Sequence, residues 1–348
     1  MHGKKIIKKM VRKKVVRKKA VLFTLISLLL AAMFVALFSA QYQYNPDDRS
    51  QASNTRVKVL DTYVRNFELY VEESLQISGY KTLDSLYNYS VGRNMFFNNS
   101  AEFNTTFANC ITCGYMNCTN RTVSCPDPLK GYDLSSMLSN ISSLANQHLN
   151  IVTDYRINSV VVYQVRPFDV EIDLNISYNV SDIVSTNYAI WNKNLLIHKT
   201  ILITDLYDPL VAINTHNAYR KIIRPTSICT DAKVNDTCWD LNKTRAFYNS
   251  QEYKQYTNGT NYLARFWNGT GPSGYSGIES LLNVSYMTGN NSFVDTYYWT
   301  RTYVCPPGTT RILQINSTAL NFLLDEGTAA RYNITNAATL ICPPLPTS

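Results

Sequence analysis

Histidine is scarce in this chain, with only four in 348 residues, and the usual catalytic signatures are missing. No HExxH motif occurs, which excludes a zincin-type metalloprotease, and there is neither a Walker A nor a GxGxxG loop for a nucleotide. The stretch GPSGYSG at 271–277 fails as a serine-hydrolase elbow because no glycine lies two residues after Ser273 or Ser276. Because no catalytic motif is present, we expect neither an enzyme nor a cofactor.

Acidic residues are absent from the first 40 positions, which contain ten Lys and Arg, and Ala20–Ala40 carries no charge at all. An apolar run of this length spans a bilayer as a helix, and the basic flank keeps the N-terminus in the cytoplasm. A cleaved signal peptide is the alternative, but such apolar regions are shorter, and Phe38 is bulky for the −3 position of a cut after Ala40. We therefore predict a single-pass protein of the cell membrane that contacts lipid through Ala20–Ala40 and has an extracellular C-terminal domain.

Most of the excess positive charge belongs to the N-terminal segment. Of 33 basic residues, 10 precede the apolar run, which leaves 23 basic and 25 acidic residues, or a net charge of −2, for the rest. An almost neutral exterior part offers no strongly positive surface to bind the phosphate backbone of a nucleic acid. We therefore expect no nucleic-acid partner.

All eight cysteines follow the apolar run, and an even count on the oxidising side of a membrane predicts disulfide bonds. The first four form a compact cluster with the spacing Cys-x2-Cys-x4-Cys-x6-Cys, which also permits a tetrahedral zinc site, so both interpretations stay open for it. The next two would close a small loop, and the last two would pair by elimination. The candidates are Cys110, Cys113, Cys118, Cys125, Cys229, Cys238, Cys305 and Cys342.

Asn-x-Ser/Thr sequons are in excess: 16 of the 35 asparagines begin one, where chance predicts about six. This excess indicates an N-glycosylated exterior, and the alternative is a polar composition without glycans. The candidate sites are Asn88, Asn98, Asn104, Asn117, Asn120, Asn140, Asn175, Asn179, Asn235, Asn242, Asn258, Asn268, Asn283, Asn290, Asn316 and Asn333.

Hydrophobic periodicity predicts an α+β fold with a helical first third and an antiparallel, β-rich remainder. A stripe that begins at Val57 predicts a helix from Arg56 with Gly79 as its stop, and residues 83–89 add a second short helix. Asp133 is positioned to cap another helix. Residues 98–128 look like an irregular disulfide knot, and 317–326 like a short helix.

Strict alternation over residues 168–181 predicts a half-buried strand, with both sequon asparagines of that strand on its water face. Further strands are expected at 159–165, 195–204, 280–286, 296–304 and 310–315. The predicted domain organisation is a cytoplasmic basic segment (1–19), a transmembrane signal-anchor helix (20–42), a polar stalk (43–55), a helical and Cys-rich extracellular region (56–155) and a β-rich extracellular domain (156–348).

A basic run ending in Arg17-Lys18-Lys19 is followed by the small residue Ala20 and by an apolar helix from Val21. This arrangement resembles archaeal pilin-like and related membrane-anchored surface proteins, and the resemblance implies a surface location. In pilins a dedicated peptidase cuts near such a boundary. Leu25 stands where many pilins place Glu, and Pro46 interrupts the helix that pilins continue outward.

These observations favour a membrane-anchored, N-glycosylated, disulfide-stabilised cell-surface protein with a structural or adhesive role. Its partners would be other envelope proteins or surface glycans. Two alternatives remain open. One is a pilin-like filament subunit, and the other is a membrane-anchored extracellular hydrolase, which would need paired carboxylates in a cleft.

Overall fold

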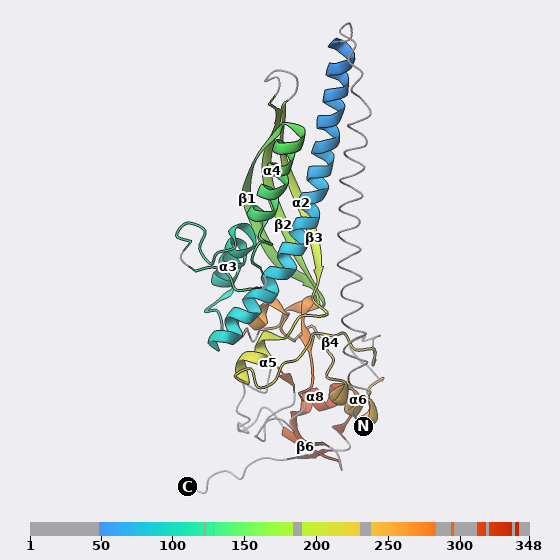
Figure 1. The fold of residues 1–348 in the computed structure, drawn as a ribbon. Coiled ribbons are helices and arrows are strands. Elements are labelled where there is room, and N and C mark those ends of the chain that lie inside the picture. Colours follow the sequence, from blue (N-terminus) through green and yellow to red (C-terminus); the bar gives the residue numbers. More distant parts are fainter. Residues whose placement is uncertain are drawn as a thin grey trace, which may run out of the picture. The chain divides into compact units, whose positions relative to one another are not determined.

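The structure, a computed structural model, describes residues 49–121, 123–127, 129–183, 190–229, 238–269, 271–282, 294–295, 312–317, 320–335 and 338–340 (Figure 1). The chain divides into two compact units, Met1–Arg56 and Val57–Ser348, and the contacts below belong to the second. The predicted basic segment and the run Ala20–Ala40 lie outside the described residues. Within the described part, no helix combines the length and the hydrophobicity needed to cross a bilayer. The fold is α+β, with a helical N-terminal part and antiparallel sheets, as the periodicity predicted.

Helix α2 (Arg49–Arg93) is the longest helix of the described chain, at 45 residues. Its predicted stripe is buried from Leu60 to Leu75. The prediction that Gly79 ends the helix is wrong, because the helix continues for another 14 residues and absorbs the short helix expected at 83–89. A Cβ at Gly79 would collide with the side chains of Ile172 and Ile201, so this glycine allows α2 to approach the sheet closely. The helix also starts earlier than expected, inside the predicted stalk.

Two shorter helices follow. Helix α3 (Ser100–Cys113) corrects the prediction of an irregular knot: Asn99 caps its N-terminus by accepting from the backbone N–H of Glu102 at 2.9 Å, and Gly114 ends it in the left-handed conformation. Helix α4 (Leu134–Leu149) is capped by Asp133, as predicted, through a 2.9 Å bond from Ser136 N–H.

The central sheet has the order β1-β2-β3 and is antiparallel throughout: β1 (Ile151–Arg166), β2 (Asp169–Asp182) and β3 (Ile190–Leu202). The predicted buried face of β2 is confirmed, because Val170, Ile172, Leu174, Ile176, Tyr178 and Val180 are all buried, but Glu171 on the predicted water face is buried as well. This face packs against α2 and α4, and its side chains join the larger of two hydrophobic cores. Strand β1 begins at Ile151, before the predicted boundary at residue 156.

Strand β3 lies at an edge of the sheet, where unpaired backbone groups can recruit other chains. Lys193 and Lys199 lie on its inward face, opposite the buried residues Tyr178 and Ile172 of β2. Lys193 pairs with Glu68 of α2 at 2.5 Å, and Lys199 pairs with Glu72 at 3.0 Å. Inward-pointing charges of this kind are a common protection against edge-to-edge association.

The C-terminal part is built from short elements around a second hydrophobic core that includes Trp239, Phe247 and Tyr332. The expected helix at 317–326 is wrong: residues 320–325 pair as a strand with β6, and the helix follows them. In chain order the elements are α5 (Pro209–Asn214), α6 (Leu241–Ser250), β4 (Lys254–Gln255), η1 (Leu263–Trp267), η2 (Gly274–Ser276), β5 (Ile278–Glu279), β6 (Ile312–Ser317), β7 (Leu320–Asp325), α8 (Glu326–Arg331) and β8 (Ala338–Leu340). The strand predicted at 296–304 lies outside the described residues.

Candidate functional site

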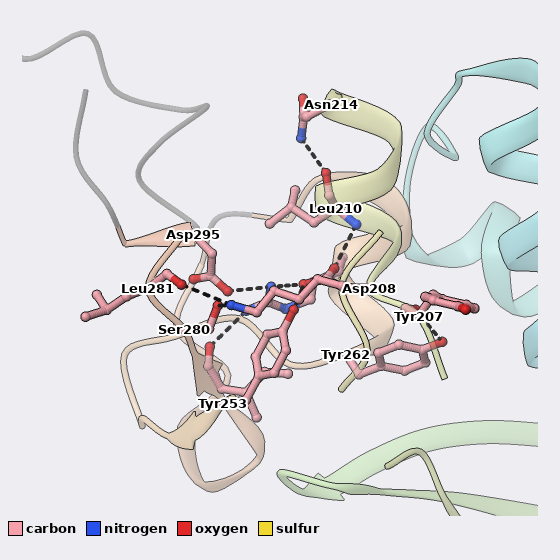
Figure 2. Close-up of polar contacts among 12 residues, drawn as sticks. Tyr207, Asp208, Leu210, Asn214, Tyr253, Tyr262, Ser280, Leu281 and Asp295 are labelled. Carbon is pink, nitrogen blue, oxygen red and sulfur yellow. Dashed lines mark hydrogen bonds and ion pairs between the residues drawn. The ribbon is translucent and has the colours of Figure 1, made fainter. Parts of the chain in front are cut away.

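A group of buried polar and charged side chains, here called the Lys221 cluster, joins Asp208, Lys221, Tyr253, Arg265, Ser280 and Asp295 (Figure 2). Each residue is 2% exposed or less. They come from six separate segments between the cap of α5 and the residue pair 294–295, so the tertiary fold brings together residues up to 87 positions apart.

Arg265 lies at the centre of this cluster. Its Nη1 donates to Asp208 Oδ2 at 2.6 Å and to Asp295 Oδ2 at 2.8 Å, while Nη2 donates to the carbonyl of Ile278 at 3.0 Å. Burial alone would lower the pKa of Arg265, but attraction to the two carboxylates outweighs it and raises that pKa further. The guanidinium is therefore a permanent charge that holds two anions in one buried place.

Asp208 performs two tasks. Its Oδ1 accepts from the backbone N–H of Leu210 at 2.9 Å and so caps α5. Its Oδ2 accepts from Arg265 and, at 2.6 Å, from the hydroxyl of Tyr253. Burial and the nearby carboxylate raise the pKa of Tyr253 well above its usual value, so this hydroxyl stays a donor.

Lys221 is the unusual member. Its Nζ donates to Ser280 Oγ at 2.5 Å and to the carbonyl of Leu281 at 3.1 Å, and it lies 4.8 Å from the centre of the Tyr253 ring. Burial lowers the pKa of Lys221 to about 7, although Asp295 and Asp208 pull it upward. Burial also raises the pKa of Asp295. An amine of low pKa beside a hydroxyl is the arrangement of a base and a nucleophile, but both groups are buried here.

A second buried cluster holds the opposite side of the same segment. Arg331 binds both carboxylate oxygens of Glu279 at 3.1 Å, and Tyr332 donates to Glu279 at 2.8 Å. Lys254 approaches the same carboxylate at 3.5 Å. Burial would raise the pKa of Glu279, but its two cations outweigh burial and lower it. Glu279 thus belongs to this second network, while its neighbour Ser280 belongs to the Lys221 cluster. The two buried networks together hold in place a part of the chain that has little regular secondary structure.

On the outer face of the central sheet, His198 lies between two carboxylates. Its Nε2 is 2.8 Å from Glu171 and its Nδ1 is 2.8 Å from Asp173, while Arg166 approaches Glu171 at 3.1 Å. The hydrogen bond to Asp173 raises the pKa of His198, so the charged imidazolium is favoured. No group of three or more His, Cys, Asp or Glu that could hold a metal occurs among the described residues.

The structure joins the cysteines of the compact cluster as Cys110–Cys125 and Cys113–Cys118. It also joins Cys229 to Cys238, nine residues apart. These pairings leave no thiolate of the cluster for zinc. Cys305 and Cys342 lie outside the described residues.

Sequon asparagines lie at the surface wherever their side chains are described: eleven of twelve are exposed, and Asn175 is half-buried on the outer face of β2. Asparagines outside sequons are exposed to a similar degree, so this placement permits glycans without distinguishing sequons. Asn235, Asn283 and Asn290 lie outside the described residues, and the side chain of Asn316 does as well.

Sequence reasoning missed the Lys221 cluster entirely. No member of the cluster belongs to a sequence motif. Only the fold brings these common residue types together. No family model, no curated protein and no solved structure matches the chain.

Proposed function

We propose that the chain is a membrane-anchored cell-surface protein whose disulfide-bonded, N-glycosylated exterior part has a structural or adhesive role. The observation that carries this proposal is the state of the Lys221 cluster. Its charged groups are buried and bind internal partners, although the Nε of Arg265 has none, and this is how a polar network stabilises a fold rather than how it meets a substrate. Three disulfides add support, and the exposed asparagines of the sequons are compatible with glycans.

The hydrolase alternative receives less support from this geometry. A glycoside hydrolase needs two carboxyl groups that flank an accessible sugar. Asp208 and Asp295 are the closest match, yet both are fully buried and bind the same guanidinium nitrogen of Arg265. Because Arg265 neutralises their charge and solvent does not reach them, Asp208 and Asp295 are poorly suited to general acid–base catalysis.

Fractionation of the native host tests the leading proposal. We expect the full-length protein in the membrane fraction, with an intact mass above that of the polypeptide and a fall in mass after chemical deglycosylation. A protein recovered in the soluble cytoplasmic fraction, at the polypeptide mass and with free thiols, would refute the proposal.

A pilin-like subunit is the second candidate. The resemblance at the N-terminus implies a helix that continues outward from the membrane, and α2 begins only three residues after Pro46. N-terminal sequencing of the mature protein decides between the two. A chain that starts at Ala20 or Val21 supports the pilin-like subunit, and an intact Met1 removes it.

A further inference from the structure

Buried hydroxyls without a hydrogen-bond partner gather at sequons. Four serine or threonine hydroxyls in the described part of the chain are buried without a partner, and three of them, on Ser90, Ser142 and Thr260, stand two residues after a sequon asparagine. Yet only 10 of the 36 serine and threonine side chains that the structure describes occupy such a position. A buried, unpaired hydroxyl destabilises the folded state, so the fold does not explain these three residues.

The glycan acceptors of these sequons are Asn88, Asn140 and Asn258, and all three are exposed. Asn88 and Asn140 lie within α2 and α4, where residues two apart project about 160° away from each other, on nearly opposite sides of the helix. A transferase that recognises both the amide and the hydroxyl cannot contact them together on such a helix. In the third sequon Thr260 is 1% exposed, so a transferase that contacts Asn258 at the surface cannot reach its hydroxyl.

Other sequons provide a contrast. Thr244, which follows Asn242, is also buried, but its hydroxyl donates to the carbonyl of Asp240 at 2.8 Å and so supports the start of α6. Thr119 and Thr335, which follow Asn117 and Asn333, are exposed together with their asparagines. In these last two sequons the folded chain presents both recognised groups to solvent.

We propose that Asn88, Asn140 and Asn258 are glycosylated before the chain folds, and that Ser90, Ser142 and Thr260 are retained for recognition by the transferase. In this transfer the anomeric carbon of a glycosyl phosphate donor bonds to the asparagine Nδ2, its bond to the phosphate oxygen breaks, and the amide proton leaves with the phosphate. The inference rests on the proposed function, because it requires an exterior domain that meets such a donor as it emerges.

Timing of transferase addition tests the order of events. The full chain is synthesised in a cell-free system, and a detergent extract of native-host membranes, which contains transferase and donor, is added either during synthesis or after folding is complete. Glycopeptide mass spectrometry then reports occupancy at each site. We expect Asn117 and Asn333 to be modified in both arms, and Asn88, Asn140 and Asn258 only when the extract is present during synthesis.

Two results would overturn the inference while leaving the proposed function standing. Equal occupancy of Asn88, Asn140 and Asn258 in both arms would show that the folded chain is an acceptor. Absence of glycan at these three sites in both arms, with Asn117 and Asn333 modified, would show that their hydroxyls serve no transferase. Absence at every site, the two exposed controls included, would instead remove the glycosylated exterior itself.

A pair of identical substitutions tests whether the hydroxyls serve the fold. In unglycosylated protein, Thr260→Val should leave the midpoint of thermal unfolding unchanged or raise it, because no hydrogen bond is lost. Thr244→Val should lower the midpoint, because the bond to Asp240 is lost. An equal fall in both variants would show that Thr260 is kept for stability and would contradict the inference.

Discussion

Replacing Asp208 by asparagine should destabilise the folded domain strongly. The fully buried carboxylate accepts from Arg265 and from Tyr253 at 2.6 Å each. Asparagine keeps an oxygen for the cap of α5 but leaves Arg265 with one anion in place of two. Loss of one partner from a buried ion pair costs about 3–5 kcal/mol. Because Asp295 still binds Arg265, we expect about 3 kcal/mol, a large share of the usual 5–15 kcal/mol of total stability.

Urea unfolding of the detergent-solubilised protein, followed by tryptophan fluorescence, measures this loss. The midpoint should fall while the dependence on urea keeps its slope. The matched control is Asp61→Asn, which breaks an exposed pair with Arg65 at 3.1 Å and should cost less than about 0.5 kcal/mol. Equal effects of the two substitutions would refute the view that the Lys221 cluster stabilises the fold.

Three further predictions concern other features. Because burial lowers the pKa of Lys221 to about 7, the unfolded state binds one more proton than the folded state from about pH 7 to 10. The free energy of unfolding should therefore rise with pH over this range, by up to about 1.4 kcal/mol per pH unit. The midpoint of urea unfolding should show this rise in the wild type and lose it in Lys221→Met. Gly79→Leu should lower the free energy of unfolding by about 1–3 kcal/mol, because the new side chain overlaps Ile172 where α2 packs on the sheet. Calorimetry measures this loss, and an unchanged unfolding temperature would contradict the packing. Removal of the Cys110–Cys125 disulfide, which spans 15 residues, by a double alanine substitution should cost about 3 kcal/mol, and a loss near zero in urea would contradict the pairing.

Features that depend on local pattern could be predicted from the sequence. Strict alternation in β2 identified its buried face residue by residue, since a strand's side chains alternate in direction whatever lies around it. Asp133 was recognised as a cap because an N-cap needs only the first turn of its helix. The stripe on α2 from Leu60 to Leu75 was recognised for the same local reason.

Features that depend on distant residues could not be predicted. Gly79 was interpreted as a helix stop, because its actual role, contact with Ile172 and Ile201, involves strands about 90 to 120 residues away. The Lys221 cluster brings together ordinary polar residues from separate segments, and no spacing along the chain marks them. The buried hydroxyls without a hydrogen-bond partner could not be predicted either, because a sequon does not reveal whether its serine or threonine is buried.

Protease treatment of intact host cells tests the central claim most directly, since the account places nearly all residues after Ala40 outside the membrane. Mass spectrometry should detect peptides from the described domain in the medium, with their disulfides and glycans, while the cytoplasmic Lys/Arg-rich segment stays with the cells. A domain that remains intact until the cells are lysed, and is then degraded, would contradict the account.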